Sequence, residues 1–533
     1  MERATVPDAG AGADERHGAA RHTAEFLRVK ALAERGVASA QHQLGFMYVN
    51  GQSVPRNEEL AVGWYRKAAA AGFEQAQYNL GVMYQKGQGV AQDHAQALYW
   101  YRCAASQGYA PAQYNLGWLY AKGQGATADV GEALHWFSQA ANQGDAGAQH
   151  NLGMMFDGGK GVAQDTDAAL SWYRRAAEQG YARSQFALAL RYDGGQGVAR
   201  DPVLALDWLR RAAEQGHAPA QFNLALRFDK GQDLAQDSRQ AVHWYERAAQ
   251  QGHASSQFNL ALIHDSGHGV PRDEGVALAW YRRAADQGHA AAQDNLGLRY
   301  EHGQGVERDP ASAAHWYRQA AAQGLPAAQY HLGQLFDNGN GVDHDPAQAA
   351  HWYLQAAEQG HLRAQFDLGL RYEGGVGVAQ DPARALDWYR RAADQDYAPA
   401  QHMVGVLLER MEASDPREAA HWYRKAADQG HALAQFALAL RYDSAHGVPR
   451  DYEAAHFWYL CAARQGHARA QFNLGVMYAA GQGAQRDLLE AHDWLARAAA
   501  GGVAGAGAYL KRVSTRMDAQ QLEMVQGYSQ EAA

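Results

Sequence analysis

The sequence contains few cysteines, no excess of positive charge and no long apolar run. Only two cysteines occur among 533 residues, so a disulfide framework cannot be the basis of its stability. Acidic residues outnumber basic ones, 57 to 48, and the net charge of −9 argues against a surface that follows nucleic-acid phosphates. Apolar stretches of about 18 residues are absent, which argues against membrane insertion.

The first 23 residues lack a basic start followed by an apolar run, so they do not resemble a secretory signal. Cys103 and Cys461 occupy the same position of two distant repeats, so they are not expected to meet. These observations together predict a cytoplasmic protein with reduced cysteines.

The most informative feature that is present is a tryptophan at a constant interval. The spacing is 36 residues, except for one step of 34 between Trp388 and Trp422. The row consists of Trp64, Trp100, Trp136, Trp172, Trp208, Trp244, Trp280, Trp316, Trp352, Trp388, Trp422, Trp458 and Trp494. A fixed period in this range is typical of a solenoid, in which each unit buries its apolar face on its neighbours. We interpret the tryptophan row as core.

One repeat, residues 182–217, predicts two helices. Gln185, Leu188 and Tyr192 share one helical face, and a glycine-rich loop then ends the first helix. Asp201 is suited to cap a second helix, with Pro202 at its first position. The second helix presents Trp208 and stops near Gly216. The predicted fold class is therefore an all-α solenoid of about thirteen helix-turn-helix repeats of 36 residues.

Three segments are expected along the chain. Residues 1–23 are predicted to form a flexible N-terminal tail, residues 24–512 the solenoid with degenerate caps, and residues 513–533 a polar C-terminal segment. The expected end units lack the usual tryptophan or glutamine and are more polar, as a finite array requires for solubility.

The repeat resembles the Sel-one-like repeat, a relative of the tetratricopeptide repeat. The motif includes Ala76–Gln77, Leu80–Gly81, Gly89–Val90, Trp100–Tyr101 and Ala104–Ala105. The resemblance implies a right-handed α/α superhelix, a bacterial origin and a role as an adaptor for protein complexes. One cysteine-rich branch of that family is linked with penicillin binding, but its paired cysteines are missing here.

A second stripe on the first helix is the candidate binding surface. Phe186, Leu190 and Asp193 share this stripe, and by analogy with tetratricopeptide solenoids it would line the concave groove. The candidate partner-binding residues are Tyr114, Phe186, Phe222, Phe258, Tyr330, Phe366, Asp157, Asp193, Asp229, Asp265, Glu301, Asp337 and Glu373. One hypothesis is a groove that grips a partner segment carrying Lys or Arg and apolar anchors. The alternative is that each carboxylate accepts hydrogen bonds from glycine amides in the following loop.

Two other periodic residue types have simpler interpretations. Arginines precede the first-helix aromatic at Arg191, Arg227, Arg299, Arg371 and Arg441. We expect them to lie over an aromatic ring or to pair with the nearby acid, and the alternative is a contact with a partner carboxylate. Most histidines also recur at equivalent positions, too far apart to share one zinc ion. No metal site, cofactor or catalytic residue is predicted.

The rhythm breaks once, between Asp396 and Asp415. Asp396 replaces the closing glycine of a repeat, where a side chain makes positive φ costlier. The following loop is two residues shorter and lacks the usual glycines. We predict a local change of curvature there; the alternative is a loop deletion without consequence.

The favoured function is a non-catalytic scaffold or adaptor that binds a partner protein or peptide, without nucleic acid. One alternative is a regulatory or inhibitory subunit dedicated to one enzyme. Another is an enzyme of cell-wall or β-lactam chemistry. The partner and the oligomeric state do not follow from the sequence.

Overall fold

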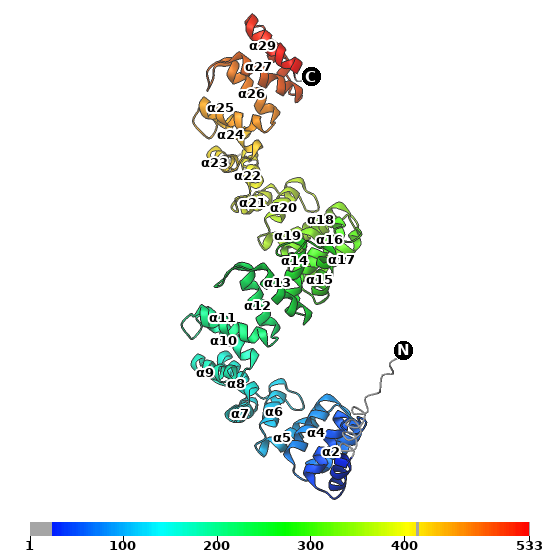
Figure 1. The fold of residues 1–533 in the computed structure, drawn as a ribbon. Helices are drawn as coiled ribbons and strands as arrows, with labels where there is room; N and C mark the ends of the chain where they lie inside the picture. Colours follow the sequence, from blue (N-terminus) through cyan, green and yellow to red (C-terminus); the bar gives the residue numbers. More distant parts are fainter. Residues whose placement is uncertain (1–23, 412–414, 532–533) are drawn as a thin grey trace, which may run out of the picture. The chain divides into compact units, whose positions relative to one another are not determined.

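The computed structural model describes residues 24–411 and 415–531, and within them every regular element is a helix. The helices follow one another in chain order (Figure 1). They divide into two compact units, which are described separately. The first comprises Met1–Ile263 and Gly267–Pro271, and the second His264–Ser266 and Arg272–Ala533. The all-α solenoid predicted from the repeat is confirmed.

Each repeat contributes a first and a second helix. The first helices are α2 (Ala38–Asn50), α4 (Glu74–Lys86), α6 (Ala110–Lys122), α8 (Ala146–Gly158), α10 (Ala182–Gly194), α12 (Ala218–Lys230), α14 (Ala254–Ser266), α16 (Ala290–His302), α18 (Pro326–Asn338), α20 (Leu362–Gly374), α22 (Ala398–Arg410), α24 (Ala432–Ser444) and α26 (Ala468–Ala480). The second helices are α3 (Glu58–Ala70), α5 (His94–Ser106), α7 (Val130–Asn142), α9 (Thr166–Glu178), α11 (Pro202–Glu214), α13 (Ser238–Gln250), α15 (Glu274–Asp286), α17 (Pro310–Ala322), α19 (Pro346–Glu358), α21 (Pro382–Ala393), α23 (Pro416–Asp428), α25 (Tyr452–Arg464) and α27 (Leu488–Ala500).

Further helices flank the repeats. Residues 24–34 form a helix before α2, and α28 (Ala506–Ser514) and α29 (Ala519–Glu531) follow α27. Val513 and Met517, within the predicted polar segment, are buried against Leu495 of the last repeat. Across the described ranges, each helix is too short or too polar to cross a bilayer.

Local capping sets the helix boundaries. The carboxylate of Asp201 accepts the amides of Val203 and Leu204 at 3.1 and 3.0 Å, which starts α11. Gly195 adopts φ +64° and ends α10, as a glycine at this position can without strain. The boundaries predicted for residues 182–217 are confirmed.

The interpretation of the tryptophan row as core is only partly correct. Among its members only Trp388, Trp422 and Trp494 are buried, and the others are half-buried. The fully buried aromatic is instead the tyrosine that follows the tryptophan, as in Tyr101, Tyr245, Tyr281, Tyr317, Tyr389, Tyr423 and Tyr459. This tyrosine packs on the small residue of its own first helix, because a Cβ at Gly81 would lie 2.7 Å from the ring of Tyr101.

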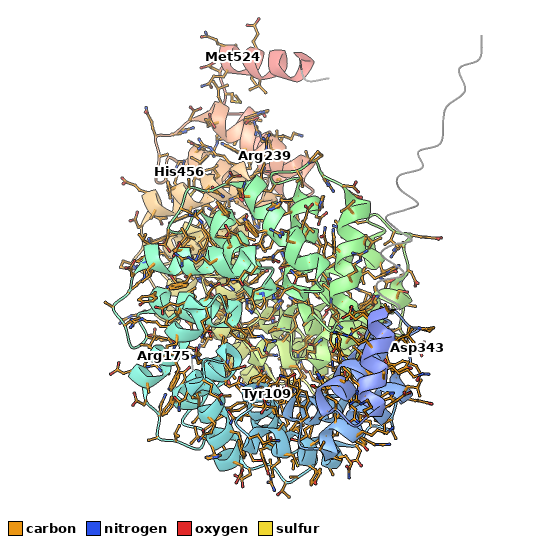
Figure 2. The ribbon with its side chains drawn as sticks, turned by 60° about the horizontal axis from the view of Figure 1, so that its bottom comes forward. Tyr109, Arg175, Arg239, Asp343, His456 and Met524 are labelled. Carbon is orange, nitrogen blue, oxygen red and sulfur yellow. The ribbon has the colours of Figure 1, made fainter. Side chains whose placement is uncertain are left out.

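A cation covers the outer face of many tryptophans. The guanidinium of Arg175, labelled in Figure 2, lies 4.7 Å from the ring centroid of Trp172, and Lys67 lies 4.1 Å from that of Trp64. The covering residue comes three positions later on the same helix, and its alkyl stem shields the ring while its charge stays in water. The tryptophan therefore seals the edge of the core.

Buried glutamines connect successive repeats. The side-chain amide of Gln77 donates to the carbonyl of Ala69 at 3.1 Å, and its oxygen accepts from Gln107 at 2.7 Å. Gln113 repeats the arrangement with Ala105 and Gln143. Buried amides satisfied in this way favour one register between neighbouring repeats.

The irregular repeat shows the expected backbone at Asp396, whose φ of +62° matches the positive φ of the closing glycines. Helix α22 is followed by Met411 in an extended conformation, whereas the other first helices end on a left-handed residue. Part of the short loop, residues 412–414, lies outside the described residues. The change of curvature stays a prediction.

Candidate functional site on the first-helix face

The first-helix face is defined here by positions two, five, nine and twelve of each first helix. In α10 these are Arg183, Phe186, Leu190 and Asp193, which share one side because their spacing is three or four residues. The face is described within each unit separately.

Position nine carries a row of apolar residues, of which Phe46, Met154, Leu190, Leu262 and Leu370 are exposed and the others half-buried. Only Leu190 among them was named from the sequence. The row is Phe46, Val82, Trp118, Met154, Leu190, Leu226, Leu262, Leu298, Gln334, Leu370, Val406, Leu440 and Val476, in which only Gln334 is polar. Phe46, Met154 and Leu190 are 48, 50 and 47% exposed. The sequence signal was an apolar residue directly after the small residue of the first helix, as in Gly45–Phe46 and Ala189–Leu190. Large exposed apolar patches are typical of interaction surfaces, whereas single exposed apolar residues are common on any protein.

Position five is an aromatic layer between repeats. The rings of Phe222 and His253 lie 4.9 Å apart, and Phe222 also contacts Tyr245 at 5.9 Å. Tyr330 is buried and lies between Tyr353 and His361. Of the other predicted aromatics, Tyr114, Phe186, Phe258 and Phe366 are half-buried. Phe186, Phe222 and Phe366 contact rings of the residues that follow in the chain, and each keeps part of its surface exposed.

Position twelve carries the predicted acids, and most of them pair with an arginine of the next repeat. Arg227 contacts Asp193 at 2.7 Å. The same pairing joins Asp157 to Arg191, Asp265 to Arg299, Asp337 to Arg371 and Glu409 to Arg441. The expectation that these arginines pair with nearby acids or cover aromatic rings is confirmed, since Arg299 and Arg371 also lie over Tyr281 and Tyr353.

The alternative in which glycine amides hold these carboxylates is wrong for the paired acids, because their carboxylates contact arginine instead. The loop is closed differently. The side chain of Gln164 donates to the main-chain carbonyl of Asp157 at 2.9 Å, and Arg200 donates likewise to that of Asp193 at 3.0 Å.

The remaining predicted acids differ from one another. Glu301 accepts the hydroxyl of Tyr317 at 2.8 Å. Glu373 accepts the hydroxyl of Tyr389 at 2.9 Å and pairs with Arg410 at 2.7 Å. Asp229 has no arginine opposite it, because position ten of the next repeat is Ile263. Its carboxylate therefore lacks the ion pair between repeats that Asp193 and Asp265 make.

One repeat of the second unit has a carboxylate in place of the ring at position five, and a polar cluster surrounds it. Asp294 stands where other repeats have an aromatic ring or a histidine, and its carboxylate lies 2.8 Å from Nδ1 of His331. The hydroxyl of Tyr330 donates to Asp367 at 2.9 Å, and burial raises the pKa of that carboxyl. Every acid in the cluster has a partner, so the cluster reads as a satisfied internal network.

The histidines after the closing glycine act as helix caps. Nδ1 of His361 accepts the amide of Ala364 at 3.2 Å, and His289, His431 and His467 do the same. Burial lowers the pKa of these four histidines. In the part of the chain that the structure describes, His, Cys, Asp and Glu side chains form no group suited to a metal ion.

Comparison with known proteins agrees with this architecture. The Sel1 repeat profile matches thirteen consecutive segments from residue 38 to residue 503. A protective antigen of uropathogenic Escherichia coli strains, which displays an SLR fold, is 30% identical with a TM-score of 0.50, over 95% of this chain and 94% of that one.

Two further solved structures match with lower TM-scores. A Sel1 repeat protein from Oxalobacter formigenes is 35% identical over 58% of this chain and 90% of its own, with a TM-score of 0.46. Yeast Tom70 is 12% identical over 92% of this chain and 99% of its own, with a TM-score of 0.28. No curated protein sequence matches significantly. With the family profile covering most of its length, the chain belongs to the Sel1 repeat family.

Proposed function

We propose that this protein is a non-catalytic scaffold that binds a segment of a partner protein along the first-helix face. The observation that carries the proposal is the apolar row at position nine. Leu190 and Met154 are about half exposed although neighbouring positions of the same helices are buried. A half-exposed apolar side chain contributes little to the stability of the fold. On a binding surface it contributes to affinity, because a partner removes its apolar area from water.

The partner segment would carry apolar anchors and a basic residue. The anchors would contact position nine and the half-buried rings of Tyr114, Phe186, Phe222, Phe258 and Phe366. The basic residue would meet Asp229, since the neighbouring Asp193 and Asp265 are already paired with Arg227 and Arg299. The cytoplasm of a bacterium is the proposed setting, in keeping with two free cysteines.

Capture from native lysate, read by mass spectrometry, tests the proposal. The variant changes Phe46, Met154 and Leu190 to Gln. The matched control changes Tyr99, Val130 and Val203, which are 55, 43 and 81% exposed on second helices, to Gln. Circular dichroism verifies that both variants fold.

Partners lost only by the first-helix variant would support the proposal. Identical partners for the wild type and this variant would contradict it. A second comparison uses Asp229→Lys alone, because reversing Asp193 or Asp265 also breaks an ion pair between repeats. A single stoichiometric partner would favour a dedicated regulatory or inhibitory subunit, and several partners would favour a scaffold.

A further inference from the structure

An open cavity of about 420 Å³ lies on the first-helix face of the first unit. Its walls include Tyr114, Tyr181, Arg183, Gln215 and His217, which come from three successive repeats. Its lining holds two tyrosine rings, one imidazole and a single cationic side chain. The cavity is therefore aromatic and basic, in contrast to the acidic positions further along the same helices.

The absence of a side chain at Gly147 of α8 allows Tyr114 to reach the cavity. Position two of α8 is Gly147, and a Cβ there would lie 3.0 Å from Cε2 of Tyr114. The ring of Tyr114 thus passes over the start of α8 toward the start of α10. Other repeats have a larger residue at this position, such as Gln75, Pro219 or Arg363.

The charge of Arg183 is not neutralised by an ion pair among the described residues, unlike that of Arg191 or Arg227. Arg183 is exposed. The pKa of His217 is lowered mainly by the burial of its own ring and further by the positive charge of Arg183. Burial and the same charge lower the pKa of His150 to about 4. The acid that faces Tyr114 is Asp145, and its carboxylate already caps α8 by accepting the amide of Ala148 at 2.7 Å.

Two further residues at the cavity make no side-chain cap to the helix that follows them. Tyr181 precedes α10 but makes no side-chain cap, so the positive end of that helix dipole is left uncompensated. His217 also makes no cap for α12, and its Nδ1 is buried without a hydrogen-bond partner in the described structure. The equivalent His289 and His361 use the same atom to cap their helices.

We propose that this cavity binds the carboxylate of an Asp or Glu side chain in the partner segment. Arg183 would hold the carboxylate by a bidentate pair, with the tyrosine rings packing on the aliphatic stem. The inference rests on the proposed function, because it places a second, anionic contact on the same face.

Helix geometry also sets the spacing of the partner's residues. Arg183 and Leu190 are seven residues apart on one side of α10, which corresponds to about 10 Å along the helix axis. An extended chain covers this distance in about three residues. An acidic residue about three positions from an apolar anchor is therefore the expected pattern.

Selection of random dodecapeptides displayed on phage, with the full chain as bait, tests the inference. Selected peptides should be enriched in Asp or Glu near an apolar residue. Arg183→Gln should weaken a selected peptide at least about tenfold, the usual cost of one charge-assisted hydrogen bond. Arg183→Lys should restore part of the affinity, and Arg210→Gln, on an exposed position of α11, should leave it unchanged.

The peptide itself supplies the second arm of a double-mutant cycle. Replacing the acid of the peptide by its amide should weaken binding to the wild type by the same factor as Arg183→Gln does. The same replacement should not weaken binding to the Arg183→Gln variant any further. Selected peptides that lack acids, or that bind Arg183→Gln as well as the wild type, would contradict carboxylate binding in this cavity. The proposed function would not be affected by that result. Failure to select any peptide that depends on Phe46, Met154 and Leu190 would count against both.

Discussion

The guanidinium of Arg227 in one repeat contacts the carboxylate of Asp193 in the preceding repeat, with a nitrogen–oxygen distance of 2.7 Å. The arginine side chain is only 9% exposed, and a second carboxylate, Asp233, lies 2.6 Å from its other terminal nitrogen. Asp193, which the sequence analysis placed in a candidate binding groove, thus forms an ion pair that connects two repeats.

This pairing predicts that Asp193→Ala destabilises the chain by about 1–2 kcal/mol, between the values for exposed and buried ion pairs. Asp229→Ala, at the equivalent position without an arginine opposite, should cost less than about 0.5 kcal/mol. Urea unfolding of the two variants checks the difference. Equal midpoints would show that the pair does not fasten the repeats.

The buried histidines predict a loss of stability on mild acidification. Burial lowers the pKa of His150 and His402 from 6.5 to about 4. Because the unfolded chain then binds more protons between these values, stability is complete above pH 6.5 and declines as pH falls toward 4.

At pH 5.5 each of these two histidines should cost about 1 kcal/mol. Thermal midpoints between pH 7.5 and pH 5.5 measure the decline. The double variant His150→Gln and His402→Gln should lose less over the same range. A wild type whose midpoint does not change would contradict the prediction.

The loop glycines predict a contrast between two substitutions with the same backbone strain. A Cβ at Gly377 would lie 2.0 Å from the carbonyl oxygen of Pro346 in the preceding repeat, whereas one at Gly360 would meet nothing within 4 Å. Both residues have positive φ. Gly360→Ala should therefore cost about 1 kcal/mol, from strain alone.

Gly377→Ala should cost at least about 2 kcal/mol more, because main-chain atoms must move. Chemical denaturation of the two variants measures the gap. Similar losses would mean that the loop glycine serves conformation only and not the approach of neighbouring repeats.

The different burial of neighbouring aromatics gives a fourth prediction. Tyr173 is 3% exposed, and Trp172 is half-buried with Arg175 over its outer face. Tyr173→Ala should cost about 3–5 kcal/mol, as for a fully buried ring. Trp172→Ala should lower the free energy of unfolding by roughly half as much, because part of the Trp172 ring is already exposed to water.

Hydrogen exchange of the amides in α9 measures the loss of stability in each variant. A local measurement is needed because part of a repeat array can open without unfolding of the whole chain. The reverse order, with Trp172→Ala opening α9 more readily, would restore the tryptophan as the main core residue.

The sequence by itself determined the repeat, the helix class and, for residues 182–217, the helix boundaries. These depend on neighbours within a few residues: Asp201 caps α11 and Gly195 ends α10 through contacts that the local chain order specifies. The same local logic identified positive φ at Asp396.

Only the tertiary structure decided what each periodic residue contacts. The pairing of Arg227 with Asp193, the approach of Gly377 to Pro346 and the passage of Tyr114 over Gly147 all join different repeats. Such contacts depend on the offset and rotation between stacked helix pairs. A period of 36 residues shows that repeats stack, but it does not show which side chains that stacking brings together, because the offset arises from packing across the whole interface.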